Sequence, residues 1–509
     1  MIAHLLSLPR RLAGWRADLL AALAGALTAA ALPPVHAIPV LLLTLPCLLG
    51  LIGACRSVGQ AFRRGWWFGF GLNLFGLYWV TEAILVEAER FWWLVPLAVP
   101  ALAAVIGVFS GVAAMGARVA AEGLPRVLAL AGAWTLMDLG RQFILTGFPW
   151  NPLGSVWEVP GGFGDMMIQP AALASVHGLT LATVLLGCAP VLGVRGRVLC
   201  AAALALWCGG GVLALNAAPK VSATAARVVV VQGNVPQGQK WDRSLVDSIF
   251  DRYLALTAEG LREAGPRAAA VIWPETASPY HLQTDAGARE AITAVTGDAI
   301  ALIGGVRYGP EGRPRNSLFA LAAGGTILQL YDKAHLVPFG EYQPDWLQVG
   351  VQLVPGGGFA PGPGPTTLTP PGIPPVGPMI CYEVIFPGQV ADEANRPDWL
   401  VNVTNDAWFG NSAGPRQHLA AVRMRAVEEG LPIVRAANTG ISAVFDSAGR
   451  EVSRLGMNQT GVVVADLPPP SRPTVFSRYG LILPSALAFT VLLYGLATRH
   501  TAVGTPKKS

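Results

Sequence analysis

The stretch Pro378-Met379-Ile380-Cys381-Tyr382-Glu383 is a strand-like run that carries a cysteine into the long polar part of the chain. The other five of the six cysteines lie in or beside apolar stretches, where cysteine commonly serves as a small buried hydrophobe. Cys381 therefore needs a separate explanation, and the strand that leads into it is the starting point for predicting the fold.

Two upstream stretches also place a charged side chain just after an apolar, strand-like run. Glu275 follows the run 269–272, and Lys333 follows the run 326–330. Because a sheet can bring the ends of several strands together, we expect a carboxylate, an ammonium group and a thiol to meet at one place.

These three groups suit nucleophilic catalysis. A thiol attacks as the thiolate, so Glu275 could take the proton of Cys381. Lys333 and the backbone N–H after the cysteine could stabilise the negative oxygen of a tetrahedral intermediate. The alternative is a structural ion pair between Glu275 and Lys333, with Cys381 as a core thiol.

The composition indicates a membrane protein. Of 509 residues, 52% are hydrophobic and only 13% are charged, which is unusual for a soluble enzyme. A helix that crosses a bilayer needs roughly 20 mostly apolar residues. Stretches of this kind lie near 17–32, 38–54, 65–86, 93–116, 127–145, 170–193, 198–216 and 479–497. They predict an α-helical transmembrane bundle of about eight spans, although the first stretch could also be read as a cleaved signal peptide.

The polar residues divide the chain into three parts. Residues 1–219 form an expected N-terminal membrane domain of about seven transmembrane helices. Residues 220–470 alternate strand-like and helix-like segments, including a helical patch near 387–395, and predict an α/β domain. Residues 471–509 supply a C-terminal transmembrane helix and a tail.

Basic residues indicate the orientation, because cytoplasmic loops retain lysine and arginine. They gather before the first stretch and in alternate loops, at Arg10, Arg11, Arg16, Arg56, Arg63, Arg64, Arg118, Arg126, Arg195, Arg197, Arg499, Lys507 and Lys508. We therefore expect both termini in the cytoplasm and the polar domain outside it. The net charge of +5 follows largely from this asymmetry and gives no reason to expect nucleic acid as a partner.

Other features limit the range of functions. No His or Cys pair has metal-ligand spacing and no Gly-rich nucleotide fingerprint is present, so we expect neither a metal nor a cofactor. His335 and His418 are expected as surface or supporting residues. Asp138 and Arg141 are three residues apart in a predicted span and should form an ion pair.

The triplets Trp273-Pro274-Glu275, Tyr331-Asp332-Lys333 and Cys381-Tyr382-Glu383 resemble the nitrilase superfamily in their order and spacing. The resemblance covers roughly residues 225–466 and implies an α-β-β-α sandwich. It implies Glu275 as general base, Lys333 as transition-state stabiliser and Cys381 as nucleophile.

A nitrilase-like domain between about seven spans and a last one resembles the apolipoprotein N-acyltransferase family. Further matching motifs lie at 147–152, 232–237, 240–241, 333–342, 402–409 and 435–442. The resemblance implies that a phospholipid acylates the cysteine as a thioester, and that the free amine of a diacylated apolipoprotein then accepts the chain. It also implies a bacterial cytoplasmic (inner) membrane location with a periplasmic catalytic domain, and we expect a monomer in contact with membrane lipid.

The resemblance extends to residues around the three central groups. Glu341 would lie near the lysine, and Tyr382 and Glu383 beside the nucleophile. The expected lipid-contacting aromatics are Trp241, Trp408 and Phe409 on loops, Tyr342 in a lid over 339–364, and Tyr78 at a lipid entrance. As alternatives, these carboxylates could satisfy turns and these aromatics could anchor the chain at the membrane interface.

Two other functions fit part of the pattern. A membrane-tethered carbon-nitrogen hydrolase (amidase) would use the same three groups with water as acceptor, although a soluble substrate needs only an anchor and not seven spans. A transporter with an extracytoplasmic regulatory domain would leave the ordered Glu, Lys and Cys unexplained.

Overall fold

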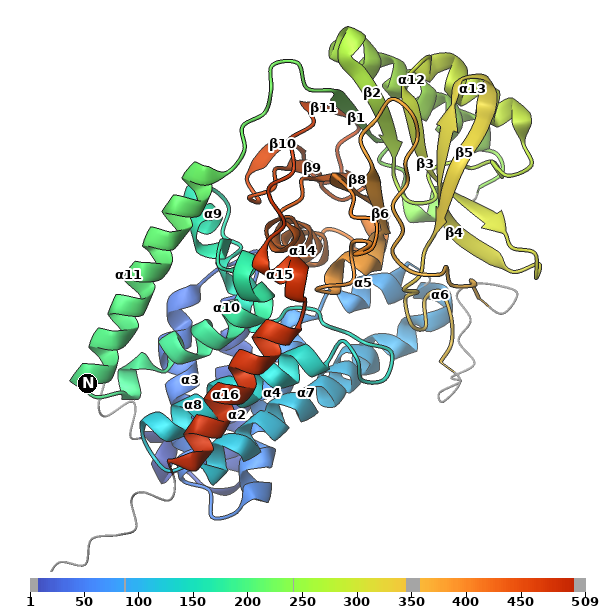
Figure 1. The fold of residues 1–509 in the computed structure, drawn as a ribbon. Coiled ribbons are helices and arrows are strands. Elements are labelled where there is room, and N and C mark those ends of the chain that lie inside the picture. Colours follow the sequence, from blue (N-terminus) through green and yellow to red (C-terminus); the bar gives the residue numbers. More distant parts are fainter. Residues whose placement is uncertain (1–7, 87, 241, 345–357, 499–509) are drawn as a thin grey trace, which may run out of the picture. The chain divides into compact units, whose positions relative to one another are not determined.

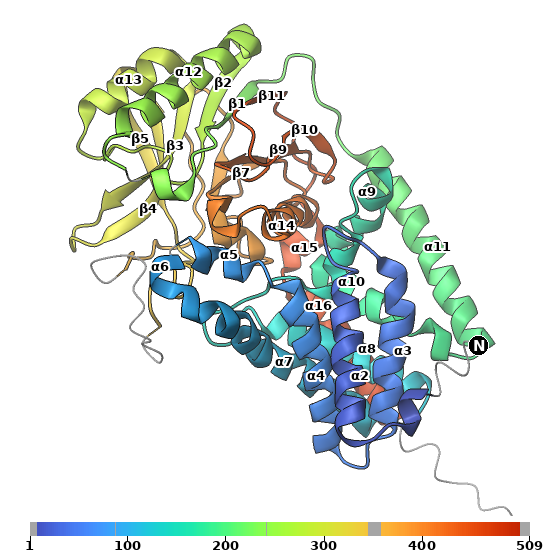
Figure 2. The ribbon, with the colours of Figure 1, turned by 180° about the vertical axis from the view of Figure 1, so that it is seen from behind.

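A computed structural model describes residues 8–86, 88–240, 242–344 and 358–498 of the chain. It consists of two compact units, drawn together in Figures 1 and 2. The first comprises Met1–Leu215 with Arg478–Ser509, and the second comprises Asn216–Ser477. Trp241 and residues 345–357, which make up half of the expected lid, lie outside the described residues.

The first unit is helical. Its helices are α2 (Gly14–Ala29), α3 (Leu41–Gly53), α4 (Val58–Gly76), α5 (Val80–Leu85), α6 (Ala88–Phe91), α7 (Val95–Val119), α8 (Leu124–Gly140), α9 (Gly162–Ile168), α10 (Ala171–Gly187), α11 (Val194–Ala217) and α16 (Ile482–Ala497). Small residues bring their backbones together: a Cβ on Gly132 of α8 would lie 2.5 Å from the Ala488 carbonyl oxygen of α16. Such close approach is typical of helices that pack in a membrane.

Among the described residues, three helical stretches are long and apolar enough to cross a membrane, namely Ala88–Val119, Ala171–Val191 and Val194–Ala217. Ile38–Gly53 and Ile482–Ala497 are shorter apolar stretches. A helix overlaps each of the expected stretches, but the number that cross a membrane stays a prediction. The ion pair between Asp138 and Arg141 is confirmed, with Nη2 2.8 Å from Oδ1.

The second unit contains two sheets. The six-stranded sheet has the order β11-β1-β2-β3-β4-β5, and the five-stranded sheet has the order β10-β9-β8-β7-β6. The strands are β1 (Arg227–Gln232), β2 (Ala268–Trp273), β3 (Ile300–Tyr308), β4 (Pro314–Ala322), β5 (Thr326–Asp332), β6 (Val376–Ile380), β7 (Trp399–Thr404), β8 (Ile433–Ala437), β9 (Ser442–Phe445), β10 (Glu451–Leu455) and β11 (Gly461–Asp466). In the six-stranded sheet β1, β2 and β3 pair in parallel, and in the five-stranded sheet β6, β7 and β8 pair in parallel.

The two sheets pack face to face and form the α-β-β-α sandwich that the resemblance predicted. Their inner faces share one apolar core, to which β1, β2 and β8 each contribute. Helices α12 (Val246–Ala264) and α13 (Ala286–Thr296) cover the outer face of the six-stranded sheet, as Figure 1 shows. Helix α14 (Gly414–Glu429) packs beside β8, and α15 (Val475–Tyr479) follows the last strand.

Local sequence explains where several of these elements begin and end. Asp285 caps α13 by accepting a hydrogen bond from the Ala288 N–H at 2.9 Å, and Gly430 ends α14 in the left-handed conformation that glycine adopts without a steric penalty.

The helix expected at 387–395 does not form. Asp392 instead accepts hydrogen bonds from the N–H groups of Ala394 and Asn395, at 2.9 and 3.1 Å, which stabilises a turn. Strand β10 was not expected from the sequence.

Candidate active site

Three loops that follow strands carry the candidate catalytic groups. Cys381 directly follows β6, Lys333 directly follows β5, and Glu275 lies two residues beyond β2. All three side chains are buried. Because β6 belongs to one sheet and β2 and β5 to the other, face-to-face packing brings the groups into one site.

Lys333 lies between two carboxylates. Its Nζ is 3.3 Å from Glu275 Oε1 and 2.9 Å from Glu341 Oε1. Burial opposes the lysine charge, but the two carboxylates outweigh it and raise the pKa of Lys333 above its ordinary value. Lys333 is therefore protonated at neutral pH, and Glu341 lies near it as the resemblance implied.

Glu275 is held as a carboxylate by several donors. Asn316 Nδ2 donates to Oε1 at 2.6 Å, and the Asn405 N–H donates to Oε2 at 2.8 Å. Burial would raise the pKa of Glu275, but the charges of Lys333 and Lys240 and these hydrogen bonds lower it overall. At neutral pH the group is ionised, so it can accept a proton.

Cys381 is the first residue of a short 3₁₀ turn, Cys381–Ile385, and has a left-handed backbone with φ of +52°. Burial raises the pKa of its thiol, the Glu275 charge raises it further, and the Lys333 charge acts in the opposite direction. The resting group is therefore a thiol, and a reaction that needs the thiolate must transfer its proton to a base.

Lys240 and Asn316 are two buried residues of the site that the sequence analysis did not select. Lys240 Nζ donates to the backbone carbonyl of Glu275 at 3.0 Å and to the hydroxyl of Thr276. Burial lowers the pKa of Lys240 to about 8, although the Glu275 and Cys381 charges oppose that shift. In the sequence Lys240 stands out only as part of the matching motif 240–241, because a single lysine on a loop has no distinctive spacing.

Glu383 connects the loop that bears the lysine to the turn that bears the cysteine. Its Oε1 accepts from the Tyr331 hydroxyl at 2.7 Å and from the Ala334 N–H at 2.7 Å. Its Oε2 accepts from the Ile380 N–H at 2.6 Å, immediately before Cys381. Burial raises the pKa of Glu383, while these bonds act against the shift. Glu383 thus has a structural function close to the nucleophile.

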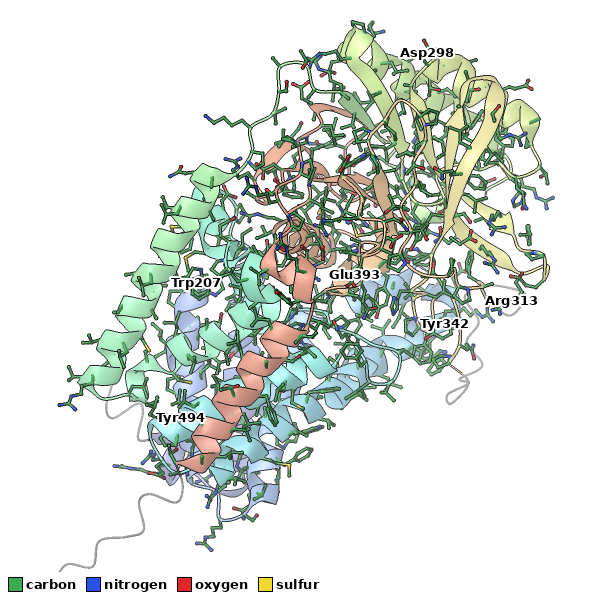
Figure 3. The ribbon with its side chains drawn as sticks, viewed as in Figure 1. Trp207, Asp298, Arg313, Tyr342, Glu393 and Tyr494 are labelled. Atoms are coloured by element: carbon green, nitrogen blue, oxygen red, sulfur yellow. The ribbon has the colours of Figure 1, made fainter. Side chains whose placement is uncertain are left out.

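The expected aromatic residues occupy different environments. Tyr382 is buried and packs edge-to-face on Phe386, with ring centroids 5.3 Å apart. Trp408 and Phe409 lie half-buried on the turn Asp406–Phe409. Tyr342, labelled in Figure 3, is also half-buried, and its backbone carbonyl accepts from the Phe339 N–H at 2.7 Å.

Tyr78 belongs to the helical unit and is 47% exposed there. In the part of the chain that the structure describes, no group of three His, Cys, Asp or Glu side chains is arranged to hold a metal ion.

Two family models match the chain. The carbon-nitrogen hydrolase model matches residues 227–472, and the model of the apolipoprotein N-acyltransferase N-terminal domain matches residues 24–189. The chain therefore combines an α/β domain of the carbon-nitrogen hydrolase class with a helical unit.

Relatives match over nearly the full length. Apolipoprotein N-acyltransferase of Rhodopseudomonas palustris is 38% identical over 96% of this chain and 96% of the relative. The enzyme of Bradyrhizobium diazoefficiens is 38% identical with the same coverage of both chains, and that of Brucella suis is 37% identical over 98% of this chain and 100% of its own. The chain belongs to the apolipoprotein N-acyltransferase family.

Among solved structures, the nitrilase-superfamily protein Nit3 of Saccharomyces cerevisiae is 16% identical, covers 52% of this chain and 97% of its own, and superposes with a TM-score of 0.37. The family assignment rests on the sequence relatives and on the two family models.

Proposed function

We propose that this chain transfers an acyl chain from a membrane phospholipid to the free N-terminal amine of the S-diacylglyceryl-cysteine of apolipoproteins. The observation that carries the proposal is the buried cluster of Glu275, Lys333 and Glu341 beside Cys381, in a chain that also has the family's N-terminal domain. Similarity over both units favours this reaction over a tethered hydrolase and over a transporter.

In the first half of the reaction, Cys381 Sγ attacks the ester carbonyl of the phospholipid. Glu275 takes the thiol proton, and the carbonyl oxygen becomes negative in the tetrahedral intermediate. Lys333 and the backbone N–H of Tyr382 stabilise that oxygen. The C–O bond then breaks, Glu275 returns the proton to the leaving lysophospholipid oxygen, and a thioester remains on Cys381.

In the second half, the neutral amine of the diacylated acceptor attacks the thioester carbonyl. Glu275 takes a proton from the nitrogen and passes it to the departing thiolate, which restores the thiol and leaves an amide. The reaction needs no cofactor, because an ester is converted to a thioester and then to a more stable amide.

Glu341 and Glu383 support these groups in different ways. Glu341 accepts a hydrogen bond from Lys333 at 2.9 Å and another from the Val337 N–H at 2.8 Å. Glu383 fixes the two loops to each other. Tyr382 is proposed to support the nucleophile beside it. Trp408, Phe409, Tyr342 and Trp241 are proposed to contact the lipid substrates, and Tyr78 is proposed to contact lipid in the helical unit.

The proposed location is the bacterial cytoplasmic (inner) membrane, with about eight spans, a periplasmic catalytic domain, cytoplasmic termini and a monomeric chain. The proposed domains are residues 1–219, 220–470 and 471–509.

Helix α11 supports contact with lipid: Leu199, Leu206 and Leu213 recur every seventh residue and are 68%, 78% and 71% exposed. Exposed leucines along one helix face suit a hydrocarbon environment better than water.

The test is intact mass spectrometry of the purified protein after incubation with a defined phospholipid. The wild type should gain one acyl chain that hydroxylamine removes, and Cys381→Ser should not form this labile adduct. A diacylated lipopeptide with a free N-terminal amine should then discharge the thioester and become triacylated.

The control acceptor is the same lipopeptide with an acetylated amine, which should leave the thioester in place. Release of free fatty acid without triacylated product would instead indicate a hydrolase. No labile adduct on the wild type would contradict the proposed mechanism.

A further inference from the structure

The backbone of Cys381 adopts a conformation that residues other than glycine rarely take. Its φ of +52° lies in the left-handed region, where a Cβ is unfavourable. Such a conformation persists only when the surroundings determine it, and this occurs preferentially at functional sites. The groups that hold the Cys381 backbone are therefore of interest in their own right.

A buried histidine contacts the carbonyl of this residue. His418, on α14, is fully buried and its Nε2 lies 3.1 Å from the Cys381 carbonyl oxygen. A carbonyl oxygen only accepts hydrogen bonds, so Nε2 must carry a proton in this contact. Both the neutral ring protonated on Nε2 and the doubly protonated ring retain the bond.

The other side of the imidazole is fixed by two buried charged residues. Nδ1 lies 2.9 Å from Asp406 Oδ1, and Arg435 Nη2 lies 2.6 Å from Asp406 Oδ2 and 3.3 Å from Nδ1. Arg435 in turn donates from Nε to the Ile441 carbonyl at 3.1 Å. A continuous set of contacts thus runs from β8 through Asp406 and His418 to the nucleophile.

The carbonyl of Cys381 and the N–H of Tyr382 belong to the same peptide group. In a planar trans peptide these two bonds point in opposite directions, so fixing the carbonyl also fixes the direction of the N–H. A hydrogen bond to the carbonyl also polarises the peptide and strengthens the N–H as a donor. In the proposed function this N–H stabilises the tetrahedral oxygen.

We propose that His418 is a positioning residue, which orients and polarises the Cys381–Tyr382 peptide so that its N–H stabilises the oxyanion. Asp406 and Arg435 hold the ring in place for this purpose. The proposal rests on the proposed function, because it assigns a role within the same site. It predicts that substituting His418 slows acylation of the Cys381 thiol more than it slows other reactions of that thiol.

The test compares two reactions of Cys381. Acylation by a short p-nitrophenyl ester develops a negative tetrahedral oxygen, whereas alkylation by iodoacetamide displaces iodide at a saturated carbon and develops none. Neither reagent requires the natural lipid donor. Both rates are measured in the full-length protein by intact mass and normalised to the wild type.

Two variants separate the two sides of the imidazole. The amide nitrogen of His418→Gln can reach the Nε2 position, whereas His418→Asn reaches only the Nδ1 position. We expect His418→Asn to slow acylation about 10- to 100-fold with alkylation changed less than about threefold, and His418→Gln to recover most of the loss.

The matched control is Arg423→Gln on the same helix. It removes a buried hydrogen bond to a backbone carbonyl, that of Gly449 at 2.9 Å, away from the cysteine, and should leave both rates near the wild type.

Equal losses of acylation and alkylation in His418→Asn, or equal effects of the Asn and Gln variants, would overturn the proposal. If the wild type reacts with the p-nitrophenyl ester but takes no acyl chain from phospholipid, the proposed function fails while the His418 comparison stands.

Discussion

Two buried groups of charged side chains in the second unit differ in the number of hydrogen-bond partners that each charged group has. The reactive cluster comprises Glu275, Lys333 and Glu341, and the supporting cluster comprises Asp406, His418 and Arg435. In the reactive cluster one ammonium group is shared by two carboxylates, at 3.3 and 2.9 Å. In the supporting cluster a guanidinium bonds one carboxylate and also backbone and amide oxygens.

The residues next to the two clusters show the same difference in hydrogen bonding. Asn316, which donates to both Glu275 and Glu341, leaves its own Oδ1 buried without a hydrogen-bond partner among the described residues. Asp406 accepts hydrogen bonds from the Thr404 hydroxyl, at 3.0 Å, and from Arg435. Burial raises the pKa of Asp406, but Arg435, His418 and the Thr404 hydroxyl outweigh burial and lower that pKa to about 2. In the proposed function the reactive cluster exchanges a proton, whereas Asp406 of the supporting cluster stays ionised.

Removing the base should have the largest effect on the reaction. We expect Glu275→Gln to slow thioester formation by about 10³-fold, because the amide keeps the shape of the carboxylate but cannot accept the thiol proton. The measurement is the rate of the hydroxylamine-labile mass gain with phospholipid.

The matched control for Glu275→Gln is Glu429→Gln. Glu429 is equally buried and pairs with Arg396 at 3.3 Å, outside the reactive cluster. Equal rates for the two variants would mean that Glu275 is not the base.

Removing the cation of the supporting cluster should act chiefly on stability. We expect Arg435→Met to lower the free energy of unfolding by about 3–5 kcal/mol, because Asp406 would remain buried without its charge partner. The measurement is denaturant unfolding of the purified protein in detergent, followed by tryptophan fluorescence.

Arg450→Met provides the comparison, because Arg450 pairs with Asp446 at 2.6 Å while its side chain stays 39% exposed. That variant should lose less than about 1 kcal/mol. A loss of the same size in both would show that the supporting cluster contributes no more than a surface pair.

The smallest expected effect concerns the pH dependence of the reactive cluster. The Lys240 charge lowers the pKa of Glu275, so Lys240→Met should raise that pKa. A base with a higher pKa becomes protonated earlier as the pH falls. The acid limb of the thioester-formation profile should therefore move upward by about one unit or more.

Lys240→Arg keeps a positive charge and should leave the acid limb of that profile near its wild-type position. An unchanged acid limb in Lys240→Met would mean that the Lys240 charge does not control the pKa of Glu275. Its function would then be limited to holding the backbone around Thr276.

Local patterns predicted much of the fold. Short β-branched runs such as 227–232 form strands because β-branched side chains favour the extended backbone locally. The patch 387–395 failed for the same kind of reason: the side chain of Asp392 bonds to nearby backbone groups and competes with a helix. The exposed strand β10 lacks a strong apolar pattern, so its pairing with β9 was not foreseen.

By itself, the sequence determined the two kinds of unit, the apolar stretches of the first, and the Glu, Lys and Cys that follow strands in the second. The tertiary structure alone decided that Lys240, Asn316 and His418 join the site. Their partners lie 35, 41 and 37 residues away, at Glu275 and Cys381. Such contacts leave no periodic signal in the chain, because they depend on how two sheets and α14 pack and not on the order of neighbouring residues.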